Sequence, residues 1–195
     1  MLIDTKGNYL TIIIQENLTQ IRVLSGQKYL YYADFLEGTI DIDKSIISFF
    51  ARELNLHIGF RTAQSIRTEI GSAVEQQTVS EIKVRSRVIG SEISGVKIQE
   101  VTVSDIQIRG AVSGYLSNLA KEVNRVVKKF KLLNNPISDD SKILLHGNGS
   151  SLNGLDEWLE KETGLSVITT PSPNNLAKKS KFFRLFRLFG KNNLC

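Results

Sequence analysis

The fold of this chain is decided by the stretch 144–167, LLHGNGSSLNGLDEWLEKETGLSV. A short apolar strand over Lys142–Leu145 is expected to run into Gly147–Gly149, and a helix is expected to open at Ser150 or Ser151. Glycine reaches positive φ at little cost, so the turn can be purely structural. A glycine turn that leads into a helix N-terminus also presents N–H groups to an anion or a nucleotide. The spacing alone leaves both interpretations open.

The predicted helix after this turn carries polar signals at its start. Ser151 is a candidate N-cap, because its hydroxyl can accept a hydrogen bond from one of the first free N–H groups of the helix. Asp156 and Glu157 fall in the first two turns, where the helix dipole favours acidic side chains. The stretch is therefore expected to form a strand, a glycine turn and a capped helix in succession.

Two blocks of sequence carry a resemblance to a known family. The stretch GNGSSLNGLDEWLEKETGLSV (147–167) resembles GGGALLRGLDELLSEETGLPV, the nucleotide-cradling strand-turn-helix of the MreB-like bacterial actins. The stretch NLHIGFRTAQSIRTEIGSA (55–73) is similar to NLLIGERTAEEIKIEIGSA of the same family. The two blocks stand in the family's order. The resemblance covers most of residues 1–170 and corresponds to the second half of an MreB-like protein.

This resemblance implies an α/β fold, namely an actin-like (RNase H-like) lobe formed by residues 1–57 and 104–170. A small inserted α+β subdomain is expected over 58–103, and an amphipathic tail over 171–195. Alternating apolar residues predict strands, and apolar residues at three- and four-residue steps predict helices. The predicted strands span 1–3, 10–14, 20–24, 29–33, 82–88, 96–103 and 166–169, the first three of them antiparallel. The predicted helices span 44–54 (with Asp43 at its start), 62–70 and 104–130.

The resemblance places the family's second phosphate loop at the first predicted hairpin. The family reads DIGGGTTD there, and this chain reads DTKGNYLT, in which Asp4 and Gly7 match. Tyr9 and Leu10 replace the two threonines, and bulky side chains obstruct the close backbone approach for which glycine is suited. Loss of phosphate binding is the favoured interpretation. Lys6 could offer a compensating charge, which leaves residual binding open.

The resemblance also implies contacts to the rest of a nucleotide. The family's Glu and Lys in TAEEIK, which reach the ribose and the base, correspond to Gln64 and Arg67. Gln64 keeps hydrogen-bonding capacity without the charge, and Arg67 keeps the charge. The turn formed by Gly147, Asn148 and Gly149 is expected to cradle the nucleotide. ATP with Mg is therefore the implied cofactor, with binding that is weak or lost.

Catalysis by this chain alone is not expected. In the family, the first lobe supplies the first phosphate loop and the acidic residue that positions the attacking water, and nothing before Met1 supplies either. An ATPase needs phosphate, metal and water positioned together. We assign no catalytic residue. His57 and His146 lack Cys or carboxylate partners at metal-ligand spacing, so no metal site is predicted.

The net charge of +5 arises in the last part of the chain. Six Lys or Arg and no acidic residue follow Pro171, so residues 1–170 hold 19 basic and 20 acidic side chains. A neutral body argues against a nucleic-acid-binding face, and no nucleic-acid partner is expected. The single Cys, at position 195, excludes an internal disulfide and indicates a reducing compartment. The sequence shows neither a signal peptide nor an apolar run that spans a bilayer.

The tail KKSKFFRLFRLFGK (178–191) has a pattern of its own. Its apolar residues recur on one helical face, and Lys and Arg interleave at three- and four-residue steps. Such a basic amphipathic helix suits an anionic membrane surface, and the alternative is that it docks on the chain's own body. The residues assigned to membrane contact are Phe182, Phe183, Arg184, Leu185, Phe186, Arg187, Leu188 and Phe189.

Together, these features imply a truncated, divergent cytoskeletal protein of cell shape and morphogenesis. It is expected in the cytoplasm, peripherally at the inner face of the membrane, in association with itself or with MreB-like filament subunits. Two alternatives stay open. The chain could be a scaffold or interaction module that binds no nucleotide and acts through its tail, or it could be one half of a split ATPase.

Overall fold

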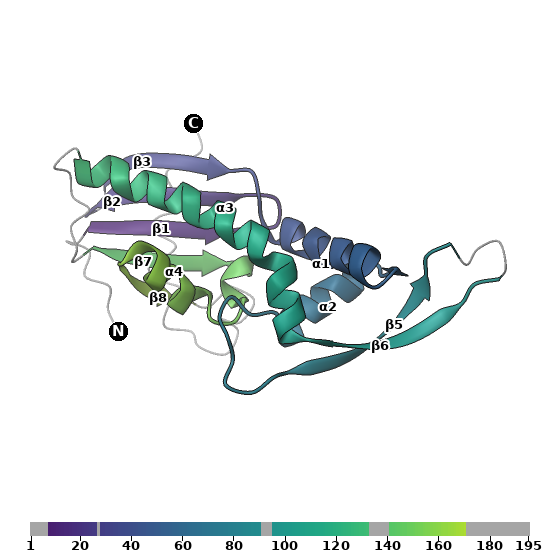
Figure 1. Cartoon of the computed structure of the whole chain (residues 1–195). Helices are drawn as coiled ribbons and strands as arrows, with labels where there is room; N and C mark the ends of the chain where they lie inside the picture. Colours follow the sequence, from purple (N-terminus) through teal and green to yellow (C-terminus); the bar gives the residue numbers. More distant parts are fainter. Residues whose placement is uncertain (1–7, 27, 91–94, 133–140, 171–195) are drawn as a thin grey trace, which may run out of the picture.

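The computed structural model describes residues 8–26, 28–90, 95–132 and 141–170. Asp4, Gly7 and the tail 171–195 lie outside the described residues, so what the sequence predicts for them stays a prediction. The described chain forms two β-sheets joined by helices (Figure 1). This arrangement agrees with the predicted α/β fold that carries a second, smaller sheet.

A five-stranded sheet forms the larger part of the molecule. Its strands are β1 (Asn8–Ile14), β2 (Thr19–Ser25), β3 (Lys28–Phe35), β7 (Lys142–Gly147) and β8 (Ser166–Thr169). They lie in the order β3-β2-β1-β7-β8. β1 is antiparallel to β2, with Ile14 opposite Thr19, and parallel to β7, with Ile14 opposite Gly147. The carboxyl ends of β1 and β7 therefore meet at one edge of the sheet.

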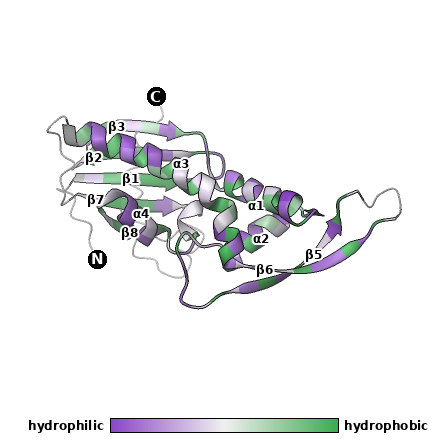
Figure 2. Cartoon of the chain, in the orientation of Figure 1, coloured by the Kyte–Doolittle hydropathy of each residue, from purple (hydrophilic) through white to green (hydrophobic). Residues whose placement is uncertain are grey.

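One face of this sheet is covered by two helices, α3 (Asp105–Leu132) and α4 (Leu155–Thr163) (Figure 1). Leu10, Ile12 and Ile14 alternate along β1 and are fully buried, as the two-residue period of a strand requires. Figure 2 shows apolar and polar residues interleaved along both helices, as expected of helices with one buried face. Burial of each such side chain contributes about 1.5–3 kcal/mol, which fixes the face that turns inward.

The second sheet has three strands, β4 (Leu56–His57), β5 (Glu81–Val88) and β6 (Ile98–Ser104). β5 and β6 form a long antiparallel hairpin that projects from the body as an arm (Figure 1). Helices α1 (Thr39–Glu53) and α2 (Phe60–Ile70) pack together between this arm and the larger sheet. Ala63, Ile66 and Ile70 are buried on one face of α2, which agrees with the three- and four-residue apolar period that predicts this helix.

The start of α1 differs from the prediction. Asp43 lies inside the helix and is 1% exposed, so its assignment as the first helical residue is wrong. The helix begins at Thr39 because Asp41 completes its N-terminus, where Oδ2 of Asp41 accepts the N–H of Gly38 at 2.9 Å. None of the described helices is long and apolar enough to cross a membrane.

The stretch that the resemblance assigns to the second phosphate loop ends inside a strand. The structure places its last four residues, Asn8–Thr11, in β1. The antiparallel neighbours β1, β2 and β3 correspond to the predicted strands 10–14, 20–24 and 29–33, which are confirmed. The predicted strand 1–3 lies outside the described residues. The parallel pairing with β7 selects β1 as the central strand, and the turn at its carboxyl end is Gln15–Leu18.

The glycine turn after β7 is required by close packing against β1. Gly147 has φ +97°, and a Cβ on it would collide with the carbonyl oxygen of Ile14. A Cβ on Gly149 would collide with the side chain of the same Ile14. Both glycines are therefore explained by the fold itself, without any ligand.

We predict that Gly147→Ala destabilises the protein. Left-handed backbone and the clash with Ile14 together should lower the free energy of unfolding by about 2–4 kcal/mol. Urea denaturation followed by circular dichroism measures this change. Gly110→Ala is the matched control, because Gly110 lies in α3 with open space around it and should become more stable by about 0.5–1 kcal/mol. Equal stability of the two variants would contradict this account of the turn.

Candidate functional site

The two sequence blocks that carry the resemblance meet in the structure. The N–H of Ala73, just after α2, donates to the carbonyl of Asn153 at 2.8 Å, and Ser72 forms an isolated parallel bridge with the same residue. The side-chain amide of Asn153 also donates to Gln76 Oε1 at 3.1 Å. The end of α2 is thus anchored to the segment between the glycine turn and α4.

The glycine turn lies at the same edge as the β1–β2 hairpin. Gly147, Asn148 and Gly149 lie at the carboxyl end of β7 as predicted, and of the three only Asn148 is exposed. The hairpin Gln15–Leu18 leaves the adjacent carboxyl end of β1. This shared edge is the candidate site.

The N-terminus of α1 closes onto the same hairpin through backbone hydrogen bonds. The N–H of Thr39 donates to the carbonyl of Gln15 at 3.0 Å, and the N–H of Ile40 donates to the carbonyl of Glu16 at 3.0 Å. A Cβ on Gly38 would collide with both carbonyl oxygens, so the approach needs glycine. The first N–H groups of α1 are therefore used inside the protein.

The helix after the glycine turn starts later than predicted. α4 begins at Leu155 with Gly154 as its N-cap, so a start at Ser150 or Ser151 is wrong. Asn148–Ser151 form a short 3₁₀ turn in which the hydroxyl of Ser151 donates to the carbonyl of Asn148 at 2.8 Å. A hydroxyl that donates to a carbonyl does not cap N–H groups. The positions predicted for Asp156 and Glu157 are confirmed, since both lie in the first turn of α4.

The two nucleotide candidates on α2 differ in exposure. Gln64 is exposed, whereas Arg67 is only 6% exposed. Nε of Arg67 lies 2.6 Å from Oδ1 of Asp43, and Nη2 lies 3.4 Å from Oδ2. Burial raises the pKa of Asp43 above its ordinary value, while the hydrogen bond and the charge of Arg67 oppose that rise. The guanidinium of Arg67 thus ties α2 to α1 rather than facing the surface.

His146 precedes the glycine turn as the second-last residue of β7. Burial, with a smaller contribution from the charge of Arg22, lowers the pKa of His146 to about 4. The imidazole is therefore neutral at pH 7, as expected of a half-buried strand residue. Among the described residues, no group of three or more His, Cys, Asp or Glu side chains could hold a metal ion.

The comparisons with known proteins agree with this geometry. A family model described as MreB/Mbl protein matches residues 3–181. The chain belongs to the MreB/Mbl family. Cell shape-determining protein MreB of Escherichia coli (strain K12) is 28% identical over 155 residues, which are 80% of this chain and 44% of that protein. The chain thus spans less than half of this curated relative.

Solved structures show the same fold. MreB5 of Spiroplasma citri bound to ADP superposes with a TM-score of 0.76 at 19% identity, over 95% of this chain and 56% of that one. A MamK double helical filament superposes with a TM-score of 0.64 at 13% identity, over 85% of this chain and 50% of that one. These likenesses establish the actin-like α/β fold that the resemblance implied.

Sequence reasoning predicted the strands that flank the hairpin Gln15–Leu18 but missed its position beside the glycine turn. The family's second phosphate loop was assigned to the stretch that contains Asp4 and Gly7, which precedes β1 and lies outside the described residues. The loop that joins β1 to β2 at the edge of the glycine turn is Gln15–Leu18 instead. The turn signal Glu16-Asn17 was visible in the sequence, but only the parallel partner of β1 shows which hairpin reaches this edge.

The buried pair of Arg67 and Asp43 yields a stability prediction. Arg67→Met should lower the free energy of unfolding by about 3–5 kcal/mol, because it leaves the carboxyl of Asp43 buried without a partner. Asp43→Leu combined with Arg67→Met should recover most of that loss, since neither charge then remains. Thermal and urea unfolding measure both changes.

Lys44→Met provides the control on the same helix. Lys44 pairs with Asp41 at 3.1 Å, but its side chain is 66% exposed, so its loss should be much smaller. If Arg67→Met were as stable as Lys44→Met, the guanidinium of Arg67 would not be committed to Asp43.

Proposed function

We propose that this chain is an actin-like component of the apparatus of cell shape that associates with filaments and no longer binds ATP. Membership of the MreB/Mbl family supports the role in cell shape, since the matched relative is named a cell shape-determining protein. The similarity to a MamK filament supports association with itself or with MreB-like subunits. The main support for the loss of ATP binding is the composition of the hairpin Gln15–Leu18.

This hairpin lacks the chemistry that phosphate requires. Gln15, Glu16 and Asn17 are exposed and contain no glycine, whereas the family's loop carries three in DIGGGTTD. At the N-terminus of α1, the N–H groups of Thr39 and Ile40 already donate to the carbonyls of Gln15 and Glu16. A carboxylate 4 Å from a phosphate charge costs about 1 kcal/mol in water and about 4 kcal/mol near a protein surface, so Glu16 opposes binding.

The residues on α2 that the resemblance assigns to adenosine also favour weak nucleotide binding, for a different reason. MreB5 of Spiroplasma citri is solved with ADP, which shows that a protein of this fold can bind a nucleotide. In this chain the exposed Gln64 is available for hydrogen bonds, but Arg67 is held by Asp43. A single neutral amide would supply little of the affinity that a phosphate cradle normally adds. The proposal therefore includes no independent ATPase activity.

We predict that ATP does not bind at physiological concentrations. Isothermal titration of the purified chain with ATP and Mg²⁺ should give no saturable heat up to millimolar nucleotide, because the hairpin has no glycine and no positive charge and exposes the carboxylate of Glu16. MreB5 of Spiroplasma citri, solved with ADP, serves as the positive control. Saturable binding at micromolar ATP would show that the candidate site at the sheet edge still binds nucleotide, and would contradict the proposed loss of ATP binding.

We further propose that the tail holds the chain at the inner membrane surface. Its aromatic and basic residues, Phe182 to Phe189, combine apolar area with positive charge, which together favour an anionic bilayer interface. The neutral balance of residues 1–170 means that the attraction must come from the tail. The chain would then be cytoplasmic and peripheral to the membrane.

Vesicle co-sedimentation tests this membrane role. The full chain should sediment with vesicles that contain phosphatidylglycerol and much less with pure phosphatidylcholine. A variant with serine at positions 182, 183, 186 and 189 should bind at least about tenfold more weakly, because it loses four phenylalanine side chains. Unchanged sedimentation of this variant would favour a tail that docks on its own body.

A further inference from the structure

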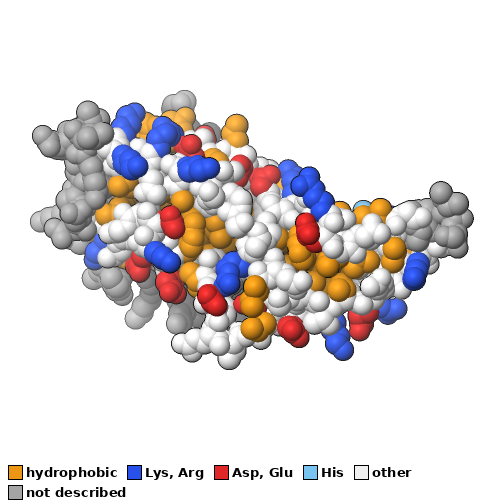
Figure 3. Space-filling model, viewed as in Figure 1, with side chains coloured by type: hydrophobic (Ala, Val, Ile, Leu, Met, Phe, Trp, Pro, Cys, Tyr) orange, Lys and Arg blue, Asp and Glu red, His pale blue; other side chains and the backbone are white. Residues whose placement is uncertain are grey.

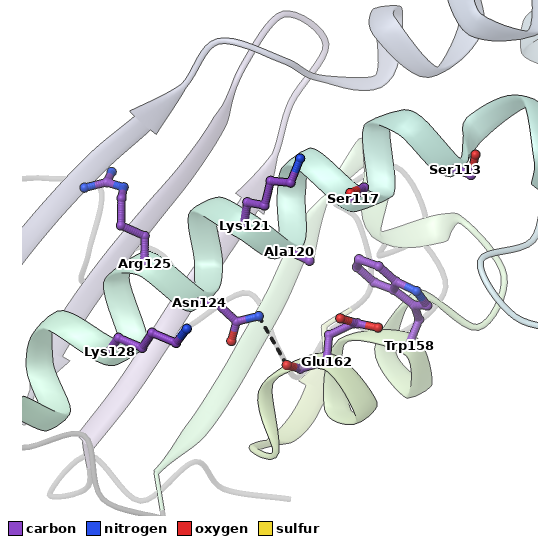
Figure 4. A pocket seen from close by; sticks show the side chains of 9 residues that line it. All are labelled: Ser113, Ser117, Ala120, Lys121, Asn124, Arg125, Lys128, Trp158 and Glu162. Carbon is purple, nitrogen blue, oxygen red and sulfur yellow. Dashed lines mark hydrogen bonds between the residues drawn. The ribbon is translucent and has the colours of Figure 1, made fainter.

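A groove of about 700 Å³ runs between α3 and α4 (Figure 4). Trp158 of α4 forms one wall and lies against the side of α3 that carries Ser117 and Ala120. The side-chain amide of Asn124 on α3 donates to the carbonyl of Glu162 on α4 at 3.2 Å, which fixes the two helices relative to one another. The groove is thus a preformed surface between two anchored helices.

The α3 side of this groove is positively charged. It is lined by Lys121, Arg125 and Lys128. Figure 3 shows basic side chains gathered over the C-terminal half of α3. Arg125 donates to Glu122 at 2.9 and 3.0 Å, so its charge is partly neutralised. Within the described part of the chain, neither Lys121 nor Lys128 takes part in an ion pair. Two exposed ammonium groups therefore flank the groove.

Helix electrostatics explain only part of this charge. Basic residues near a helix C-terminus interact favourably with the helix dipole, and this accounts for Lys128. Lys121 lies well before the last turn of α3, which ends at Leu132, so the dipole gives it no comparable stabilisation. Its position beside a partly buried tryptophan suggests a binding surface instead.

We propose that this groove binds an acidic helical segment of a partner protein. A partly buried tryptophan in a groove with polar residues around it is a typical point at which binding energy concentrates in protein interfaces. An apolar side chain of the partner packs on Trp158, and its carboxylates face Lys121 and Lys128. Charge complementarity of this kind selects the partner and speeds its association.

The spacing of the two lysines defines the partner's pattern. Lys121 and Lys128 are seven residues apart on one helix, which places them about 10 Å apart along the axis. A second helix matches this spacing with carboxylates at positions i and i+7. Trp158 lies against Ser117 and Ala120, which precede Lys121 on α3. An apolar residue at i−4, on the same face as the two carboxylates, can therefore reach it.

Trp158 makes the proposal directly measurable, because it is the single tryptophan of the chain. The probe is an alanine-based helical peptide with Leu at i−4 and Glu at i and i+7, titrated into the full chain while tryptophan emission is recorded. We expect a saturable change in emission. A peptide of the same composition with the second Glu moved to i+5, on the opposite face, should bind at least about tenfold more weakly.

Charge variants distinguish specific binding at this groove from attraction of the peptide by the overall charge of the chain. Lys121→Glu with Lys128→Glu should weaken binding of the peptide at least about tenfold. Lys44→Glu with Lys83→Glu makes the same change in net charge on α1 and β5 and should leave binding unchanged. Circular dichroism confirms that all four exposed substitutions preserve the fold.

Three results would overturn the proposal. The first is no saturable change in emission up to millimolar peptide. The second is an equal loss of affinity in both double variants, which would indicate attraction by overall charge. The third is a change in emission with duplex DNA or anionic vesicles that depends on Lys121 and Lys128 while the peptide gives none, which would assign the groove to another class of partner.

Discussion

The structure depends on the parallel pairing of β1 with β7. This pairing brings the carboxyl ends of both strands to one edge and sets Ile14 directly against the turn that begins at Gly147. Because no side chain fits between them, the turn must contain glycine. The hairpin Gln15–Leu18 and the start of α1 then follow from the same edge, since the next segments leave the sheet there.

Because of this packing constraint, the backbone fold of the candidate site does not depend on whether the site binds a nucleotide. Gly147 and Gly149 are required by packing on Ile14, so their presence says nothing about a bound nucleotide. The exposed residues Gln15, Glu16 and Asn17 carry no such packing requirement. A chain can therefore lose the glycines of the hairpin, and with them an anion site, without losing its architecture. The glycines that resemble a nucleotide motif most clearly are the least informative about binding.

Much of this fold could be predicted from local sequence. The helices 62–70 and 104–130 and the strands 82–88 and 166–169 agree with α2, α3, β5 and β8, because their apolar periods are long or their bounds are marked by turns. The strands 10–14, 20–24 and 29–33 likewise agree with β1, β2 and β3. What could not be predicted is that the hairpin between β1 and β2 lies beside the glycine turn. Strand pairing is non-local. Which hairpin reaches the glycine turn depends on which strand pairs with β7, and the local turn signals do not show this.

Side-chain roles proved less transferable than positions. Arg67 occupies the position of a family lysine that reaches the nucleotide, and its charge alone suggested the same role. The structure shows Asp43 one helix away, at 2.6 Å, in surroundings that exclude water from both groups. A buried guanidinium that left its carboxylate would leave two unpaired charges, at a cost of several kcal/mol. Binding a ribose through Arg67 would therefore require breaking the tie between α1 and α2, so at this position stability and nucleotide binding compete for one side chain.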